Sequence, residues 1–131
     1  YVDRGNSRVT RMWKPGPFVR DAMRTGWAAP HPAFFVRRCV YESVGVYRTD
    51  LRLAGDYEFM LRALYVHDIS SEYMDAVCVR MREGGASAGS LKKRIQGWSE
   101  LKKAWSVNGL PIPPLFIIRR VIGKLFQFRI F

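Results

Sequence analysis

All seven prolines of this 131-residue chain fall into two short stretches, four between residues 14 and 32 and three between 111 and 114. Because proline fixes φ and lacks an N–H, neither stretch can continue a helix or a central strand. Both stretches are therefore loops that separate the regular elements before, between and after them. The first stretch also carries aromatic side chains, which predicts a shaped loop with a short helix near 19–24.

Hydrophobic patterning between and around these stretches alternates between strand and helix. Apolar or alternating runs at residues 8–13, 33–38 and 72–82 predict strands, and those at 39–45, 56–66 and 91–109 predict helices. The order predicts an α/β fold with a mixed sheet and packed helices. Because the strands are few and the chain opens inside a strand-like pattern, we expect them to be part of a larger layer.

Composition and charge are those of one globular domain with an uneven distribution of cations. Hydrophobic residues make up 48% and charged residues 25%, and the net charge is +11. Residues 84–131 hold nine Lys/Arg and one acid, so most of the excess lies there. Cys39 and Cys78 lack C-x-x-C spacing and are expected to be buried thiols, and the two histidines are isolated, so no metal site is predicted in the chain.

The last segment is amphipathic, and we divide the chain into residues 1–110 and a basic amphipathic tail at 111–131. As a helix, the tail has one apolar stripe (Ile118, Val121, Ile122 and Leu125) opposite a polar face (Arg120, Lys124 and Gln127). It is shorter than a membrane span and charged throughout. This pattern favours contact of residues 115–131 with an anionic membrane surface, and the alternative is packing on the domain's own core.

Asp56 follows Gly55 and directly precedes an apolar helical run. A carboxylate there can be an N-cap or first-turn acid, because it satisfies orphan N–H groups and complements the helix dipole. The position also suits a catalytic base at a loop-to-helix junction. Glu58 cannot pair with it as in a hydrolytic carboxylate dyad, because residues two apart on a helix point in different directions. A lone carboxylate favours group transfer over hydrolysis.

Two other sets of residues are candidates for ligand binding. His31, between two prolines, and Trp27 could face a saccharide acceptor, although a loop histidine bonded to a carbonyl and a core tryptophan remain alternatives. Arginines at the end of a predicted strand precede a Gly-Gly loop, which is a weak signal for phosphate binding. These residues are Arg80, Arg82, Gly84 and Gly85.

The motifs "PHPAFFVRR", "GDYEFMLR" and "VRMREGGAS", in this order and spacing, resemble the C-terminal, acceptor-side half of bacterial family 2 glycosyltransferases of the colanic-acid or capsule polysaccharide type. The resemblance covers roughly residues 1–95. It implies a nucleotide-diphospho-sugar transferase fold (GT-A type), Asp56 as catalytic base, and Trp27 and His31 on the acceptor side. The donor-binding half and the D-x-D acids that hold Mg²⁺ or Mn²⁺ have no counterpart in this sequence.

We therefore expect a fragment of an inverting hexosyltransferase that moves a sugar from a nucleotide-diphosphate donor to a polysaccharide or lipid-linked acceptor. Alone it is expected to be inactive. We also expect a cytoplasmic location, peripheral on the inner face of the plasma membrane, and no nucleic-acid partner, because the cations do not interleave with aromatic residues. The alternatives are a non-catalytic remnant of the family and a basic module that binds anionic membrane or nucleic acid.

Overall fold

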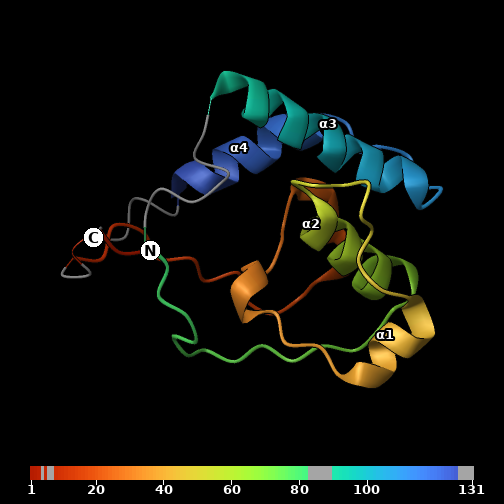
Figure 1. Ribbon diagram of the computed structural model, residues 1–131, viewed down its shortest axis with the longest axis horizontal. Helices are drawn as coiled ribbons and strands as arrows, with labels where there is room; N and C mark the ends of the chain where they lie inside the picture. Colours follow the sequence, from red (N-terminus) through yellow and green to blue (C-terminus); the bar gives the residue numbers. More distant parts are fainter. Residues whose placement is uncertain (4, 6–7, 83–89, 127–131) are drawn as a thin grey trace.

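The computed structural model describes every residue except 4, 6–7, 83–89 and 127–131 (Figure 1). Helical turns take up 48% of the described residues and strand bridges 3%, and no sheet forms among them. The predicted α/β fold with a mixed sheet of the nucleotide-diphospho-sugar transferase type is therefore wrong for the described part of the chain.

The order of elements is η1 (Arg20–Thr25), η2 (His31–Ala33), α1 (Arg38–Val44), α2 (Gly55–Met60), η3 (Leu61–Val66), α3 (Leu91–Val107) and α4 (Phe116–Phe126). η1 and η2 are 3₁₀ turns, and η3 continues α2 as π-helical turns. α3 and α4 lie along one side of the molecule in Figure 1, with α2 below them. An extended segment after η3 runs along the opposite edge in the same view.

The predicted helices are confirmed because their signals are local. The turn near 19–24 is η1, and the run at 39–45 is α1, which ends at Gly45 with φ +85°. The amphipathic segment at 91–109 forms α3, and the described part of the predicted tail contains α4. Gln127 and the rest of the tail lie outside the described residues. Each of these stretches carries its own periodicity and stop signal, so no distant partner is needed to form it.

The predicted strands are wrong for a physical reason. Residues 72–82 are extended and almost all exposed, but they pair only through a single bridge, Val2 with Arg82. A second bridge joins Val2 to Val9, and residues 33–38 run from η2 into α1 without pairing. Alternating apolar residues set an extended backbone, but a sheet requires neighbouring strands for its N–H and C=O groups. Cys39 and Cys78, expected to be buried, are both exposed.

The core forms where α2 and η3 pack against α3 and the start of α4. Trp105 is fully buried, its indole N–H donates to the Tyr57 hydroxyl at 3.1 Å, and its ring lies 5.7 Å from that of Phe116. A second, smaller cluster lies under α1 around Phe59. Because Phe116 opens α4 and is itself buried, the first turn of α4 belongs to the core.

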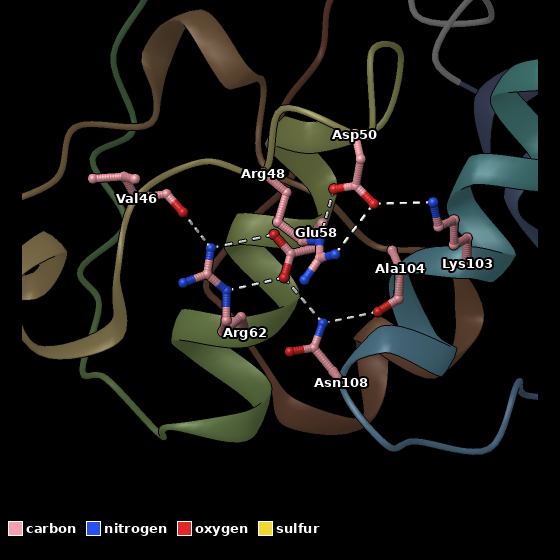
Figure 2. Close-up of polar contacts among 8 residues, drawn as sticks. All are labelled: Val46, Arg48, Asp50, Glu58, Arg62, Lys103, Ala104 and Asn108. Atoms are coloured by element: carbon pink, nitrogen blue, oxygen red, sulfur yellow. Dashed lines mark hydrogen bonds and ion pairs between the residues drawn. The ribbon is translucent and has the colours of Figure 1, made fainter.

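Two buried carboxylates fix the position and direction of α2. Glu100 of α3 accepts hydrogen bonds from the backbone N–H groups of Leu53 (2.6 Å) and Ala54 (3.1 Å), where the chain enters α2. Glu58, within α2, accepts from Arg62 at 2.9 Å and from Asn108 at 3.1 Å (Figure 2). The N-terminus of α2 is thus held by one carboxylate and its inner face by the other.

Arg62 and Asn108 extend this second contact to two other helix ends. Arg62 donates to the carbonyls of Val44, the last residue of α1, and Val46, two residues beyond it. Asn108 donates to Ala104 at the end of α3 with a distance of 2.8 Å (Figure 2). Arg62 and Glu58 thus form an i,i+4 ion pair that ties α2 to the ends of α1 and α3.

Candidate functional site

Asp56 is the second residue of α2, and the N-cap position belongs to Ala54. The Asp56 carboxylate accepts a hydrogen bond from the N–H of Tyr57 at 2.7 Å through Oδ1. Asp56 is therefore a first-turn acid, as one of the two interpretations of the sequence proposed. Its side chain remains 38% exposed, so a ligand can reach it. Glu58 points instead into the network of Figure 2, away from any pairing with Asp56.

His31 lies against Asp56, although 25 positions separate them in the sequence. The distance between His31 Nδ1 and Asp56 Oδ2 is 3.2 Å, and half of the His31 side chain is exposed. Pro30 and Pro32 flank His31 and hold it in the 3₁₀ turn η2. Two residues that the sequence analysis chose on separate grounds are thus brought together at the surface.

The contact is an ion-pair distance between an imidazole and a carboxylate. An ionised carboxylate only accepts, so a proton between the two groups would be carried by His31 Nδ1. The other ring nitrogen, Nε2, would then be the one that meets a ligand. The pair therefore offers a carboxylate oxygen and an oriented imidazole to one small region of solvent.

An aromatic pair from the segment around α1 borders this region. Tyr41 and Tyr47 pack on Phe59, with ring centroids 4.9 Å and 4.7 Å from it, and Tyr47 is 43% exposed. Burial raises the pKa of Tyr47 to about 12, and a hydrogen bond to Tyr41 and the charge of Asp56 add to the rise. At neutral pH Tyr47 is a neutral phenol that presents a ring face and a hydroxyl near Asp56.

α4 brings a partly buried cation to the same region. Arg120 donates from Nη1 to the Gly26 carbonyl at 2.8 Å, and its guanidinium carbon lies 4.8 Å from the centre of the Tyr57 ring. Its Nε is buried and has no hydrogen-bond partner. Burial lowers the pKa of Arg120, while the charges of Tyr57 and Asp56 act in the opposite direction.

Lys124 lies one turn further along α4, on the same face as Arg120. Burial, and then the neighbouring charges of Arg120 and Arg11, lower the pKa of Lys124, while the carboxylate of Asp56 raises it. Asp56 is therefore within electrostatic reach of both cations. The sequence analysis placed Arg120 and Lys124 on the polar face of the tail but did not connect them to Asp56, because nothing local to either segment signals the contact.

The structure places Trp27 in a different setting from His31 and Asp56. Its indole N–H donates to the Pro15 carbonyl at 2.9 Å, and its ring lies 5.3 Å from that of Phe18. Trp27 and Arg80 line a cavity of about 1110 Å³ that is bounded by residues 69–81, and neither His31 nor Asp56 lines it. The proposed acceptor contact of Trp27 stays a prediction. The indole N–H of Trp27 is already bonded to the Pro15 carbonyl.

The predicted phosphate site at Arg80, Arg82, Gly84 and Gly85 stays a prediction. Arg80 and Arg82 are exposed, and Arg82 takes part in the bridge to Val2. Gly84 and Gly85 lie outside the described residues. Within the described part of the chain, no group of three or more His, Cys, Asp or Glu residues is placed to hold a metal ion. The divalent cation (Mg²⁺ or Mn²⁺) that the resemblance implies thus has no identified site there, and the step proposed below does not depend on one.

No family model, curated protein or solved structure matches this chain. Evidence for its function therefore comes from its own side chains. Among the described residues, no helix combines the length and the apolar character needed to cross a membrane.

Proposed function

We propose that this chain supplies the acceptor-side base of an inverting glycosyl transfer from a nucleotide-diphosphate sugar. The observation that carries the proposal is the contact of 3.2 Å between His31 and Asp56. It supports a site because a carboxylate and an imidazole, both accessible to solvent, converge from separate elements. The proposal rests on these side chains and on the sequence motifs, and not on the sheet fold that the described residues lack.

In the proposed step Asp56 accepts the proton of an acceptor hydroxyl as the hydroxyl oxygen attacks the anomeric carbon of the donor sugar. The new C–O bond forms while the bond to the nucleoside diphosphate breaks, and the diphosphate departs with the electron pair. His31 orients the carboxylate through Nδ1 and can meet the acceptor through Nε2. Tyr47 supplies an aromatic face of the kind on which sugar rings pack.

The assignment predicts that acceptor saccharides perturb His31 and not His67. The chain has two histidines, so the imidazole signals in an NMR spectrum give one probe of the site and one internal control. Asp56→Asn should change the His31 tautomer and weaken saccharide binding about tenfold, the value of one charge-assisted hydrogen bond. Asp68→Asn is the matched control, because Asp68 is exposed, pairs with Arg20 and has φ +52°, which asparagine tolerates.

Turnover gives the second arm of this test. Incubated with nucleotide sugars, the 131-residue chain is expected to release no nucleoside diphosphate, since it carries no recognised donor motif. In a polypeptide that joins this chain to a donor site, Asp56→Asn should lower kcat by a factor of 100 or more, the usual contribution of a general base. Equal perturbation of both histidines, or full turnover by Asp56→Asn, would contradict the proposal.

We also infer peripheral contact of α4 with an anionic membrane. The predicted apolar stripe is exposed: Ile118, Ile122 and Leu125 are 54%, 48% and 62% accessible. Arg119 is exposed beside them. An apolar stripe at the surface with adjacent cations is the arrangement of interfacial helices. The same arrangement favours an inner-face location of the kind expected from the sequence.

This contact is tested by sedimentation with vesicles that contain phosphatidylglycerol. Ile122→Glu should weaken binding about tenfold, because one aliphatic side chain contributes roughly 1.5–3 kcal/mol on burial. Val77→Glu provides the control, since Val77 is a β-branched residue 65% exposed on the extended segment, away from α4. Equal loss in both variants would assign the effect to net charge and remove α4 as the contact.

A further inference from the structure

The first half of α3 leaves its apolar side uncovered. α3 carries five apolar residues along one side at helical spacing, but only the last two of them, Leu101 and Trp105, are buried. Leu91, Ile95 and Trp98 are 69%, 54% and 38% exposed. Because these three residues are spaced four and three positions apart, they form one stripe on the helix surface. The second half of α3 therefore packs in the core, whereas the first half presents an apolar stripe to solvent.

The stripe of α3 meets the exposed stripe of α4 at an open depression. The depression has a volume of about 290 Å³ and lies between α3 and the start of α4. Lys102, which follows Trp98 by four positions and continues the stripe of α3, lines it. Ile118, which begins the exposed stripe of α4, lines it too. The two stripes thus border one surface, and the start of α3 and the end of α4 lie toward the same end of the molecule in Figure 1.

The exposed charges around these stripes are all positive. Residues 91–126 hold eight Lys/Arg and one acid, Glu100, which is buried and accepts hydrogen bonds from the chain at the start of α2. Lys103 pairs with Asp50. Among the described residues, no ion pair involves the other cations of α3, namely Lys92, Lys93, Arg94 and Lys102. An exposed apolar stripe bordered by unpaired cations is the combination that binds an anionic bilayer interface.

We propose that the first half of α3 joins α4 in a single surface that lies in the interface of an anionic bilayer, with Trp98 at the level of the headgroups. This inference rests on the membrane contact proposed for α4 and adds a second helix to it. Indole side chains favour the headgroup region because the ring is apolar and its N–H is polar. One short amphipathic segment binds a bilayer weakly, and a second segment on the same surface strengthens binding without a new partner.

The charges distinguish a bilayer from a second copy of the chain as the occupant of this surface. Two copies that paired through it would bring their cations together, and like charges across an interface are unfavourable. An anionic bilayer instead supplies the opposite charges. Long Lys and Arg side chains can reach its headgroups while the apolar stripes are buried below them.

The first experiment measures sedimentation of the full chain with phosphatidylglycerol vesicles. Ile95→Glu should weaken binding about tenfold, because the bilayer loses an aliphatic side chain and meets a negative charge. Val77→Glu is the control, since it adds the same charge at a position 65% exposed on the extended segment, outside both helices. Lys102→Gln should weaken binding about fivefold, the effect of one cation near an anionic surface, and Lys93→Gln, on the opposite side of α3, less than twofold. Equal losses in Ile95→Glu and Val77→Glu would overturn the contact of α3.

A double variant tests whether the two helices contact the same bilayer. Ile95→Glu combined with Ile122→Glu should bind about a hundredfold more weakly than the unmodified chain, because the free energies of independent contacts add. A double variant that binds no more weakly than either single variant would show that α3 and α4 do not bind together, and the single surface would be wrong. Normal binding by Ile95→Glu beside weak binding by Ile122→Glu would confine the contact to α4, with the same consequence.

Tryptophan fluorescence measures the depth of Trp98. Phosphatidylglycerol brominated near the headgroup end of its acyl chains should quench the chain, and Trp98→Phe should remove most of this quenching. Trp13→Phe is the control, because Trp13 lines the cavity bounded by residues 69–81 and no residue of α3 or α4 lines that cavity. Unchanged quenching in Trp98→Phe would overturn the position assigned to Trp98. A dimer that forms without vesicles and is lost in Ile95→Glu, measured by analytical ultracentrifugation, would assign the surface to a second copy instead.

The membrane surface and the proposed base fail separately. Ile95→Glu alters neither Asp56 nor His31, so the change that saccharides cause in the His31 signals should persist in this variant. If Ile95→Glu binds vesicles weakly while Asp56→Asn leaves turnover unchanged, the base is wrong and the surface stands. If Ile95→Glu binds vesicles normally while Asp56→Asn is inactive, the surface is wrong and the base stands.

Discussion

Glu58→Ala is expected to lower the free energy of unfolding by about 3 kcal/mol, close to the lower end of the range for breaking a buried ion pair from one side. Glu58 is 1% exposed and accepts from Arg62 and Asn108 (Figure 2). Removing it leaves a guanidinium and an amide donor short of an acceptor. The value stays near the lower end because Arg62 keeps the carbonyls of Val44 and Val46.

The surface of the same chain provides a matched control for this variant. Glu42 pairs with Arg38 at i,i+4 with the same 2.9 Å distance, but the two side chains are 61% and 92% exposed. Glu42→Ala should therefore cost no more than about 0.5 kcal/mol. Urea unfolding followed by tryptophan fluorescence measures both, since Trp105 is buried. Equal midpoints for the two variants would show that the Glu58 network does not hold α2 to its neighbours.

The limits of the sequence analysis follow from how far each signal reaches along the chain. α3 and α4 carry their periodicity within themselves, so their boundaries could be predicted closely. The apolar run at 72–82 fixed an extended conformation equally well, but a sheet depends on partners that no local pattern supplies. Resemblance to a sheet-containing family replaced that missing information and led to the wrong fold class for the described residues.

In the candidate site, too, only the residues with a local sequence signal could be predicted. His31 and Asp56 were chosen from local cues, a histidine between two prolines and an acid at the mouth of a helix, and the structure brings them within 3.2 Å. Tyr47 and Arg120 were not chosen, because each reaches the region through packing with Phe59 and Gly26 respectively. The sequence analysis also left open whether the tail packs on the core or faces a membrane. Phe116, on one face of α4, is buried in the core, whereas the apolar stripe on the other face is exposed. Contact of the exposed face with a membrane stays a prediction.

Gly26→Ala is expected to cost about 2–5 kcal/mol and to detach α4 from the domain. Gly26 ends η1 in the left-handed region, with φ +98°, where an L side chain costs roughly 1–2 kcal/mol. A Cβ there would lie 2.7 Å from the Cβ and 2.9 Å from the Cα of Arg120, so the obstacle includes the backbone of α4. Overpacking of this kind typically adds 1–3 kcal/mol. Because Arg120 donates to the Gly26 carbonyl, the variant should also lose this contact between α4 and η1.

Two other glycines separate this clash from the general effect of adding a methyl group. Gly97 in α3 and Gly123 in α4 have open space around their Cβ positions, and both lie inside helices. Gly97→Ala and Gly123→Ala should therefore stabilise the chain by roughly 0.5–1 kcal/mol. Limited proteolysis tests the mechanism directly, since a detached α4 exposes the segment around residues 111–118 to cleavage in Gly26→Ala alone. A Gly26→Ala variant as stable as Gly123→Ala, with α4 protected from cleavage, would mean that α4 does not pack on Gly26, and the position of Arg120 over the Tyr57 ring would be wrong as well.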